Sequence, residues 1–155
     1  MIAPADSTGA HLRRYALITA ARNEEAFLPG TLAAVIDQTQ RPERWVIVSD
    51  GSTDATDAIV QRHAAAYPWI RLLRLPERRD RHFAAKARCF NAGREALADL
   101  NCDFIGNLDA DITVGPDYFA FLVDRMARNP RLGVVGTPFV EDDGAIERHS
   151  FSPRS

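Results

Sequence analysis

Short apolar runs alternate along this chain with stretches in which apolar residues recur every three or four positions, as in a helix. This alternation limits the fold more than any other feature of the sequence. The runs are largely continuous, as in strands whose two faces are both buried. This order predicts an α/β fold, with a mostly parallel sheet, helices on both faces and right-handed crossovers. Strands are expected over residues 15–19, 45–48, 70–75, 104–108 and 132–135.

The segments between these runs predict four helices. Leu28, Leu32 and Val35 have the spacing of one helical face. Asn23 is expected to cap that helix, with the two glutamates that follow it in the first turn. The other helices are expected from a cap at residues 52–54 to about residue 66, over residues 84–97, and from Pro116 to Asn129.

The composition is that of one ordinary globular domain. The chain has 155 residues, of which 46% are apolar and 26% charged, and this excludes a disordered tail or a disulfide scaffold. No apolar run approaches the ~20 residues that span a bilayer, and residues 1–14 predict a flexible polar leader without a secretory signal. Two cysteines without CxxC spacing favour a reduced, cytoplasmic protein. The net charge of −2 argues against a general nucleic-acid binder.

Polar clusters follow three of the predicted strands, over residues 19–25, 49–54 and 109–111. Ligands of such sheets bind beyond the carboxyl ends of the strands, so the clusters are expected to meet at one edge. Asp109 and Asp111 are separated by one residue and follow a strand predicted to be buried, where unpaired carboxylates are costly in free energy. A divalent cation, Mg²⁺ or Mn²⁺, would offset that cost through oxygen ligands. The plainer alternative is that both residues cap the next loop.

The segment from Arg71 to Arg88 is basic in an otherwise mildly acidic chain. It holds seven basic and two acidic residues. Such a segment is either a solvated basic loop or a site for a polyanion such as a diphosphate, and both interpretations stay open.

Several common motifs are absent from the sequence, which has no GxGxxG, Walker A, GxSxG or HExxH pattern. These absences argue against a dinucleotide oxidoreductase, a P-loop enzyme, an α/β-hydrolase and a zinc protease.

Five segments carry a resemblance to a known family. They are ITAARNEE at 18–25, LAAVIDQT at 32–39, WVIVSDGSTDAT at 45–56, KARCFNAG at 86–93 and FIGNLDAD at 104–111. In this order and spacing they resemble the family 2 glycosyltransferases, inverting enzymes of the GT-A fold, a Rossmann-like fold of nucleotide-diphospho-sugar transferases. The resemblance implies that residues 15–140 form a GT-A nucleotide-sugar-binding domain.

The resemblance implies roles for four residues at the base end of the site. Asp50 would accept a hydrogen bond from the nucleotide base, and Ala20 and Arg22 would lie in the first base-binding turn. The family usually carries an aromatic residue at the position of Arg22, so any stacking on the base would here fall to a guanidinium plane. Lys86 would lie near the diphosphate or the base, in keeping with the basic segment.

Asp109 and Asp111, called the DxD residues below, have implied roles at the diphosphate end of the site. Asp111 would ligate the Mg²⁺ or Mn²⁺ that bridges the diphosphate, and Asp109 would contact the ribose or the metal. The implied reaction moves a sugar, with inversion, from a nucleoside-diphosphate sugar to a hydroxyl of a carbohydrate or glycolipid acceptor. UDP-sugars are the commonest donors in the family. The metal and nearby cations would stabilise charge on the leaving diphosphate.

Inversion also needs a general base, which the family normally supplies well downstream of the DxD residues. The carboxylates that follow the predicted metal site lie too close to it in sequence for that role, so the general base is expected outside this chain. These carboxylates are Glu141, Asp142, Asp143 and Glu147. Residues 141–155 are then a polar tail or the start of a missing acceptor half, and the fold is expected to be truncated. A truncated sheet would expose an edge or an apolar face, which predicts oligomerisation or poor solubility. A glycolipid acceptor would bring the protein to the inner face of the membrane.

Two functions stay open at the level of sequence. One is an inverting glycosyltransferase, represented here by its donor half. The other is a catalytically silent nucleotide-binding or interaction module that keeps the fold without the reaction. A sugar-phosphate nucleotidyltransferase is disfavoured, because its Gly-rich, basic signature after the first strand is missing from residues 19–23.

Overall fold

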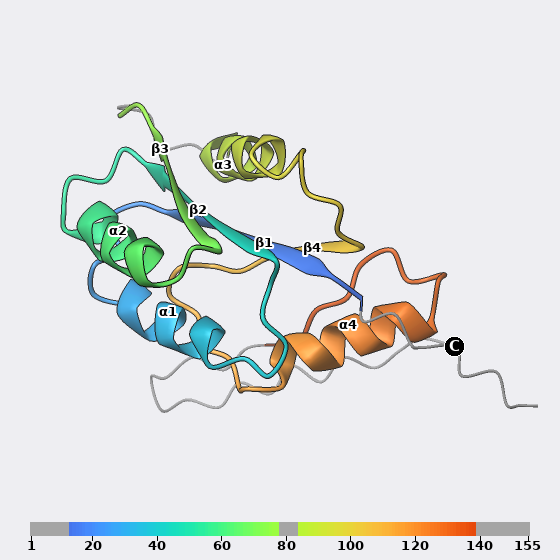
Figure 1. Cartoon of the computed structure of the whole chain (residues 1–155). Coiled ribbons are helices and arrows are strands. Elements are labelled where there is room, and N and C mark those ends of the chain that lie inside the picture. Colours follow the sequence, from blue (N-terminus) through green and yellow to red (C-terminus); the bar gives the residue numbers. More distant parts are fainter. Residues whose placement is uncertain (1–12, 78–83, 139–155) are drawn as a thin grey trace, which may run out of the picture.

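A parallel sheet of four strands organises the part of the chain that the structure, a computed structural model, describes: residues 13–77 and 84–138. The strands are β1 Tyr15–Ala21, β2 Arg44–Asp50, β3 Ile70–Leu75 and β4 Phe104–Asn107, in the order β3-β2-β1-β4 (Figure 1). The helices are α1 Leu28–Ile36, α2 Thr56–Ala66, α3 Ala84–Glu95 and α4 Tyr118–Arg128. The predicted parallel α/β fold is confirmed.

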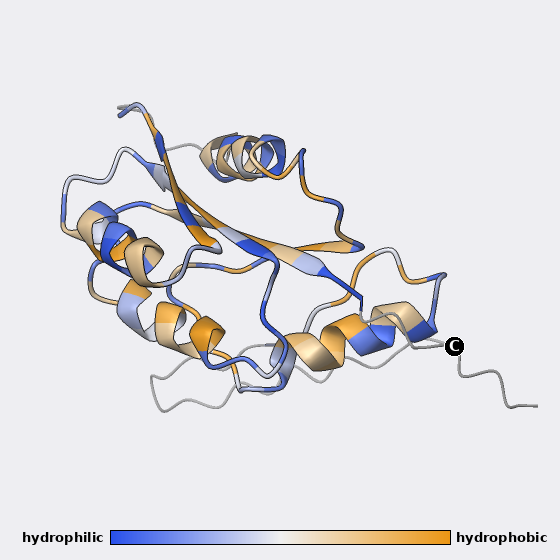
Figure 2. Cartoon of the chain, in the orientation of Figure 1, coloured by the Kyte–Doolittle hydropathy of each residue, from blue (hydrophilic) through white to orange (hydrophobic). Residues whose placement is uncertain are grey.

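The two faces of the sheet are both covered, but unequally (Figure 1). Leu17 and Trp45, which are partners in the β1–β2 register, lie in the core under α1, α2 and α4. Ile18 and Val46, the next pair, lie in a second core where, among the described residues, α3 and the segment that follows it cover the sheet. The central strands are therefore buried on both faces, which explains why their sequences are continuously apolar. Figure 2 shows hydrophobic residues along these strands, and both hydrophobic and hydrophilic residues in the connecting loops.

Helix α3 lies directly against β1. A Cβ added at Gly93 would come within 2.6 Å of a side-chain carbon of Ile18, so only a residue without a side chain lets the helix approach this closely. The close contact fixes α3, and with it Lys86 and Arg88, relative to the carboxyl ends of the central strands.

The strand predicted over residues 132–135 does not form, and this prediction was wrong. The described sheet has four strands, and Val134 is 88% exposed. A short apolar run becomes a strand only where a neighbour supplies ladder hydrogen bonds, and Gly133 weakens this run further. Within the described residues β4 pairs with β1 alone, so its outer edge is open.

The first helix begins later than its predicted cap. Asn23 has a φ of 56°, in the left-handed region, and α1 begins at Leu28 without a side-chain cap. Pro29 explains this start, because proline suits the first turn of a helix, where no N–H is needed. The predicted capping role of Asn23 was therefore wrong, and its side chain is used elsewhere.

Most of the predicted leader (1–12) and the predicted tail (141–155) lie outside the described residues, so the predicted domain limits stay predictions. Across residues 13–77 and 84–138, every helix is too short to cross a bilayer.

Candidate functional site

The carboxyl ends of β1, β2 and β4 meet at one edge of the sheet, as the sequence predicts. Ala21 at the end of β1 pairs in register with Ser49, next to the end of β2. Beyond β4, the N–H of Leu108 donates to the carbonyl oxygen of Ile18 at 3.0 Å. Ala20, expected in a turn, is a half-buried residue of β1 itself, and Arg22 follows directly after the strand. The polar clusters that follow these strands are therefore neighbours in space.

The loops after β1 and β2 are joined to one another; residues 22–25 and 52–56 are called the paired loops below. Asn23 is central to them, because its side-chain oxygen accepts hydrogen bonds from the N–H and the hydroxyl of Thr53. Further bonds run from Asn23 N–H to Ser52 Oγ (3.2 Å), Glu24 N–H to Thr56 Oγ1 (2.8 Å), Glu25 N–H to Asp54 Oδ2 (3.1 Å) and Ala55 N–H to Glu25 Oε2 (2.9 Å). The Asn-Glu-Glu segment thus shapes the backbone of this edge.

Asp50 lies between two arginines, and the three residues are called the Arg22–Asp50–Arg88 cluster below. The Asp50 side chain is 7% exposed. A terminal nitrogen of Arg88 donates to its Oδ1, and Nη1 of Arg22 lies 3.8 Å from its Oδ2. A carboxylate buried this far needs such cationic partners, because an unpaired charge would be strongly destabilising.

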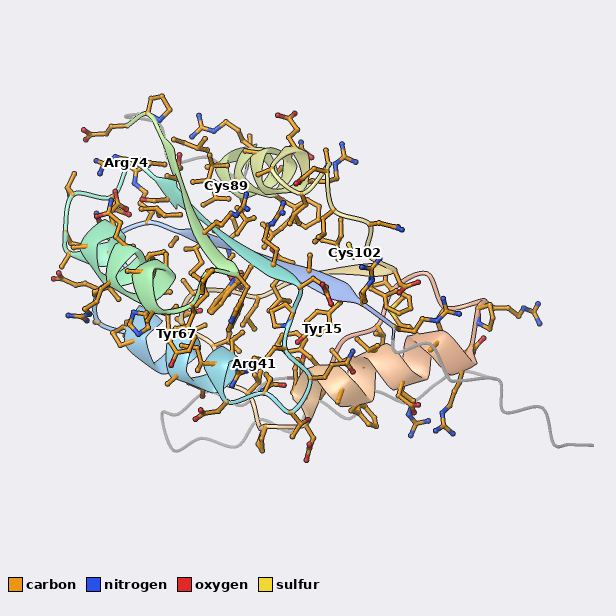
Figure 3. The ribbon with its side chains drawn as sticks, in the orientation of Figure 1. Tyr15, Arg41, Tyr67, Arg74, Cys89 and Cys102 are labelled. Carbon is orange, nitrogen blue, oxygen red and sulfur yellow. The ribbon has the colours of Figure 1, made fainter. Side chains whose placement is uncertain are left out.

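The turn after Asp50 is held tightly by β3 and by the residues that follow it. Gly51 has a φ of +67°, and a Cβ placed there would lie 2.6 Å from the Cα of Glu77, so glycine is required on both conformational and steric grounds. Arg74 of β3 donates to the Asp57 carboxylate and to the carbonyl oxygen of Ser52, beside the loop after β2 (Figure 3). These contacts fix the position of the Asp50 backbone.

The DxD residues lie in a turn beyond β4, and both are exposed. The argument that they end a buried strand was therefore wrong, although they do lie at the predicted edge. Ala110 between them is buried, and its carbonyl oxygen accepts a 2.7 Å hydrogen bond from Thr31 Oγ1 of α1. Anchoring the middle residue leaves both carboxylates at the surface. Lys86 of α3 reaches this turn, with its Nζ 3.5 Å from Asp109 Oδ2.

Glu24 shows that the paired loops and the DxD turn share one electrostatic environment. Partial burial raises the pKa of its carboxyl, and the charges of Asp111, Asp54 and Asp109 raise it further, while Lys86 lowers it. The repulsion places several carboxylates within range of one another at this edge, a setting in which a cation is favoured.

A divalent cation fits this turn only in part. Across residues 13–77 and 84–138, no three His, Cys, Asp or Glu side chains are grouped so that they could hold a metal. Asp109 and Asp111 are hard oxygen donors, and their exposure leaves room for water or phosphate oxygens to complete a coordination shell. The donor set therefore suits Mg²⁺ or Mn²⁺ held jointly with a diphosphate.

Sequence reasoning missed the positioning roles of Gln38 and Thr31. Gln38 Nε2 donates to the Gly115 carbonyl at 2.6 Å, and its Oε1 accepts from the Phe119 N–H at 3.1 Å. This buried amide joins α1 to the start of α4 and so frames the DxD turn. The available signal was its place in the Gln-Thr ending of the LAAVIDQT segment, which the resemblance included without assigning a role to Gln38. The four carboxylates considered for the general base lie outside the described residues.

Comparison with known sequences identifies one matching family model and several relatives. The sequence model described as "Glycosyl transferase family 2" matches residues 16–153. Poly-beta-1,6-N-acetyl-D-glucosamine synthase of Staphylococcus aureus strain COL is 26% identical over 83% of this chain and 29% of its own length. Beta-monoglucosyldiacylglycerol synthase of Synechocystis sp. strain PCC 6803 is 33% identical over 77% of this chain and 24% of its own length. The chain thus spans less than a third of the length of these two relatives.

Solved structures show the same fold. The mannosyltransferase PcManGT of Pyrobaculum calidifontis, in complex with GDP-Man and Mn²⁺, is 27% identical with a TM-score of 0.62, over 76% of this chain and 33% of its own. Residues 1–349 of S. aureus TarS, in complex with UDP-GlcNAc, are 15% identical with a TM-score of 0.62, over 81% of this chain and 37% of that one. The expected GT-A fold is confirmed by these neighbours.

Proposed function

The chain belongs to glycosyl transferase family 2, and from this premise we propose that it holds the nucleotide-sugar donor of an inverting glycosyl transfer. One observation carries the proposal. The Arg22–Asp50–Arg88 cluster, with its buried carboxylate, and the exposed DxD turn lie at the same edge of the sheet, and Lys86 reaches from α3 to Asp109. A base-binding carboxylate at one end and hard anionic ligands at the other match the two ends of a nucleoside diphosphate.

The residues of this edge suit the charge that such a reaction develops. When the bond between the sugar and the diphosphate breaks, negative charge grows on the leaving group. Lys86 lies where it can balance that charge, and Asp111 and Asp109 would hold Mg²⁺ or Mn²⁺. When bound there, the cation would supply Lewis-acid stabilisation of the diphosphate oxygens. The exposed position of Asp109 and Asp111 leaves the donor free to enter.

The acceptor side of the reaction is proposed from the relatives. Their names specify a polysaccharide and a glycolipid product, so a carbohydrate or glycolipid hydroxyl is the proposed acceptor. Its deprotonation needs a general base on the opposite face of the sugar, which we expect to be supplied from outside the described residues. A cytoplasmic location, at the inner membrane face when the acceptor is a glycolipid, and oligomerisation through the open edge of β4 stay predictions.

Calorimetric titration of UDP, GDP and dTDP, each with Mn²⁺ or with EDTA, tests the proposal. We expect at least one nucleotide to bind in a metal-dependent manner, and Asp111→Asn to abolish the metal dependence. Asp124→Asn is the matched control, since Asp124 is an exposed aspartate on α4 that pairs with Arg128. Absence of binding by a folded protein would refute the proposal and favour a silent interaction module.

A further inference from the structure

We propose that Lys86 is the counter-ion of Asp109 until the donor binds, and that it competes with the divalent cation for that carboxylate. In this role Lys86 weakens the binding of a cation on its own and favours joint binding of the cation and the diphosphate. The inference rests on the proposed function, because it takes the DxD turn as the diphosphate end of the site.

The ion pair joins the start of α3 to the DxD turn. Lys86 lies in the first turn of that helix, and its Nζ is 3.5 Å from Oδ2 of Asp109. Helix α3 is fixed on the sheet by the close approach of Gly93 to Ile18. The helix therefore stays in place, and a change of partner by Lys86 needs only a movement of its side chain.

The surroundings of the turn are rich in negative charge. Partial burial raises the pKa of Glu24, and three neighbouring carboxylates raise it further, those of Asp111, Asp54 and Asp109. Among the described residues, Lys86 is the cation whose charge lowers that pKa. Its ammonium group thus partly balances the same carboxylates that a divalent cation would neutralise.

Lys86 and a cation at Asp109 oppose one another electrostatically. Two positive charges attracted to one carboxylate repel each other at short range. A cation that arrives alone must therefore either accept this repulsion or displace the lysine into water. Both cost free energy, so Lys86 lowers the affinity of the turn for a cation without a diphosphate.

The pair is weak enough to be exchanged. The side chains of Lys86 and Asp109 are 73% and 48% exposed, and exposed ion pairs contribute little to stability. A lysine is a point charge with three donors on a flexible stem, so it can turn from the carboxylate to a phosphate oxygen. An arriving diphosphate thus draws Lys86 away from Asp109 and frees that carboxylate for the cation.

This exchange couples the two ligands. Once a diphosphate attracts Lys86, the cation binds without the competing charge, and once the cation is at Asp109, the lysine is available to the diphosphate. Coupling between two ligands is reciprocal, so each raises the affinity for the other by the same factor. Lys86 adds to the coupling that direct contact between cation and phosphate supplies.

The test compares the wild type with Lys86→Gln, which removes the charge. Without nucleotide, the Kd for Mn²⁺ should fall about threefold in the variant, measured from the electron paramagnetic resonance signal of free Mn²⁺. At saturating Mn²⁺, calorimetry should show weaker binding of whichever of UDP, GDP and dTDP binds the wild type most tightly, by about the same factor or more. A lysine that only contacts the diphosphate would change the second value and leave the first unchanged.

Two variants serve as controls for charge. Lys86→Arg keeps the positive charge, so its Kd for Mn²⁺ should stay close to that of the wild type. Arg94→Gln makes the same change of charge at an exposed position in the last turn of α3 and should alter neither value. Circular dichroism checks that each variant is folded.

The outcomes separate this inference from the proposed function. A Kd for Mn²⁺ that is unchanged or higher in Lys86→Gln, or no measurable Mn²⁺ binding by either protein, would overturn the inference. An equal tightening in Arg94→Gln would also overturn it, because the effect would then be one of net charge. Nucleotide binding by the wild type would leave the donor site in place in each of these cases, whereas no binding by any nucleotide would overturn both.

Discussion

Asp50 at the base end of the site is 7% exposed and already paired with two guanidinium groups, whereas Asp109 and Asp111 at the DxD turn are exposed. Around Asp50, the paired loops, Gly51 and Arg74 fix the backbone. Around the DxD turn, the anchors lie at Ala110 and Gly115, next to the carboxylates rather than on them. The base end is thus formed by folding, and the diphosphate end keeps its charges available.

The difference follows from what each end is proposed to bind. A neutral base gains affinity from polar groups held in place beforehand, because little ordering is then needed on binding. A diphosphate and a cation bring their own strong charges, so exposed carboxylates that stay hydrated until the ligand arrives are adequate.

Removal of the divalent cation should separate the two ends most clearly. With EDTA in place of Mn²⁺, we expect UDP to bind two to three orders of magnitude more weakly, since carboxylates would then face phosphate without a cation between them. Uridine, which lacks the diphosphate, should bind equally in both conditions. Calorimetry of both ligands measures the contrast, and a matching loss for uridine would mean that the cation supports the base end too.

Gly51→Ala should destabilise the base end by roughly 2–3 kcal/mol, because alanine is strained at positive φ. The added Cβ would also meet the Glu77 backbone at 2.6 Å. Gly115→Ala, near the DxD turn, is the matched control, because a Cβ there meets nothing within 4 Å. Denaturant unfolding measures both variants. Similar losses would show that the two ends are equally tightly packed.

Thr31→Val should loosen the DxD turn and leave the base end intact. The variant leaves the buried carbonyl of Ala110 without its hydrogen bond, at a cost of about 1–2 kcal/mol in unfolding free energy. Metal-dependent UDP binding should weaken, whereas uridine binding should not change. Thr31→Ser keeps the hydroxyl and serves as the control. Weaker uridine binding in Thr31→Val would show that the two ends are coupled through α1.

The four strands of the sheet and the edge where β1, β2 and β4 end could be predicted from the sequence, because buried parallel strands leave continuous apolar runs and end in polar residues. The fifth predicted strand could not form, because no described neighbour supplies its hydrogen bonds. The contacts at the edge could not be predicted. Arg88 is visible as one basic residue among seven, but its pairing with Asp50, 38 residues away, depends on how α3 lies on β1. Asn23 matches the rule for a helix cap, yet Pro29 moves the helix start and the loop after β2 takes its side chain. Local rules fail where tertiary contacts supply a stronger partner.

The smallest predicted effect concerns Asp54, which joins the paired loops through its carboxylate. Partial desolvation raises the pKa of Asp54, but hydrogen bonds from Thr56 and from the Glu25 N–H outweigh it, so the pKa lies below its ordinary value. The folded protein therefore binds this proton more weakly than the unfolded chain does. The stabilisation is present above the unfolded pKa, near 4, and is lost as the pH falls through the lower folded value.

Asp54→Ala should accordingly lower the free energy of unfolding by about 0.5–1 kcal/mol at pH 6.5, and this gap should shrink as the pH approaches 3. Urea unfolding of both proteins across this range measures the gap, and the other acidic groups cancel because both proteins share them. A gap that stays constant with pH would show that the charge of Asp54 is unimportant and that the paired loops are held by the neutral hydrogen bonds of Asn23 instead. As the pH falls and the gap shrinks, uridine should also bind the wild-type protein more weakly, because the paired loops follow the strands whose ends position Arg22 and Asp50.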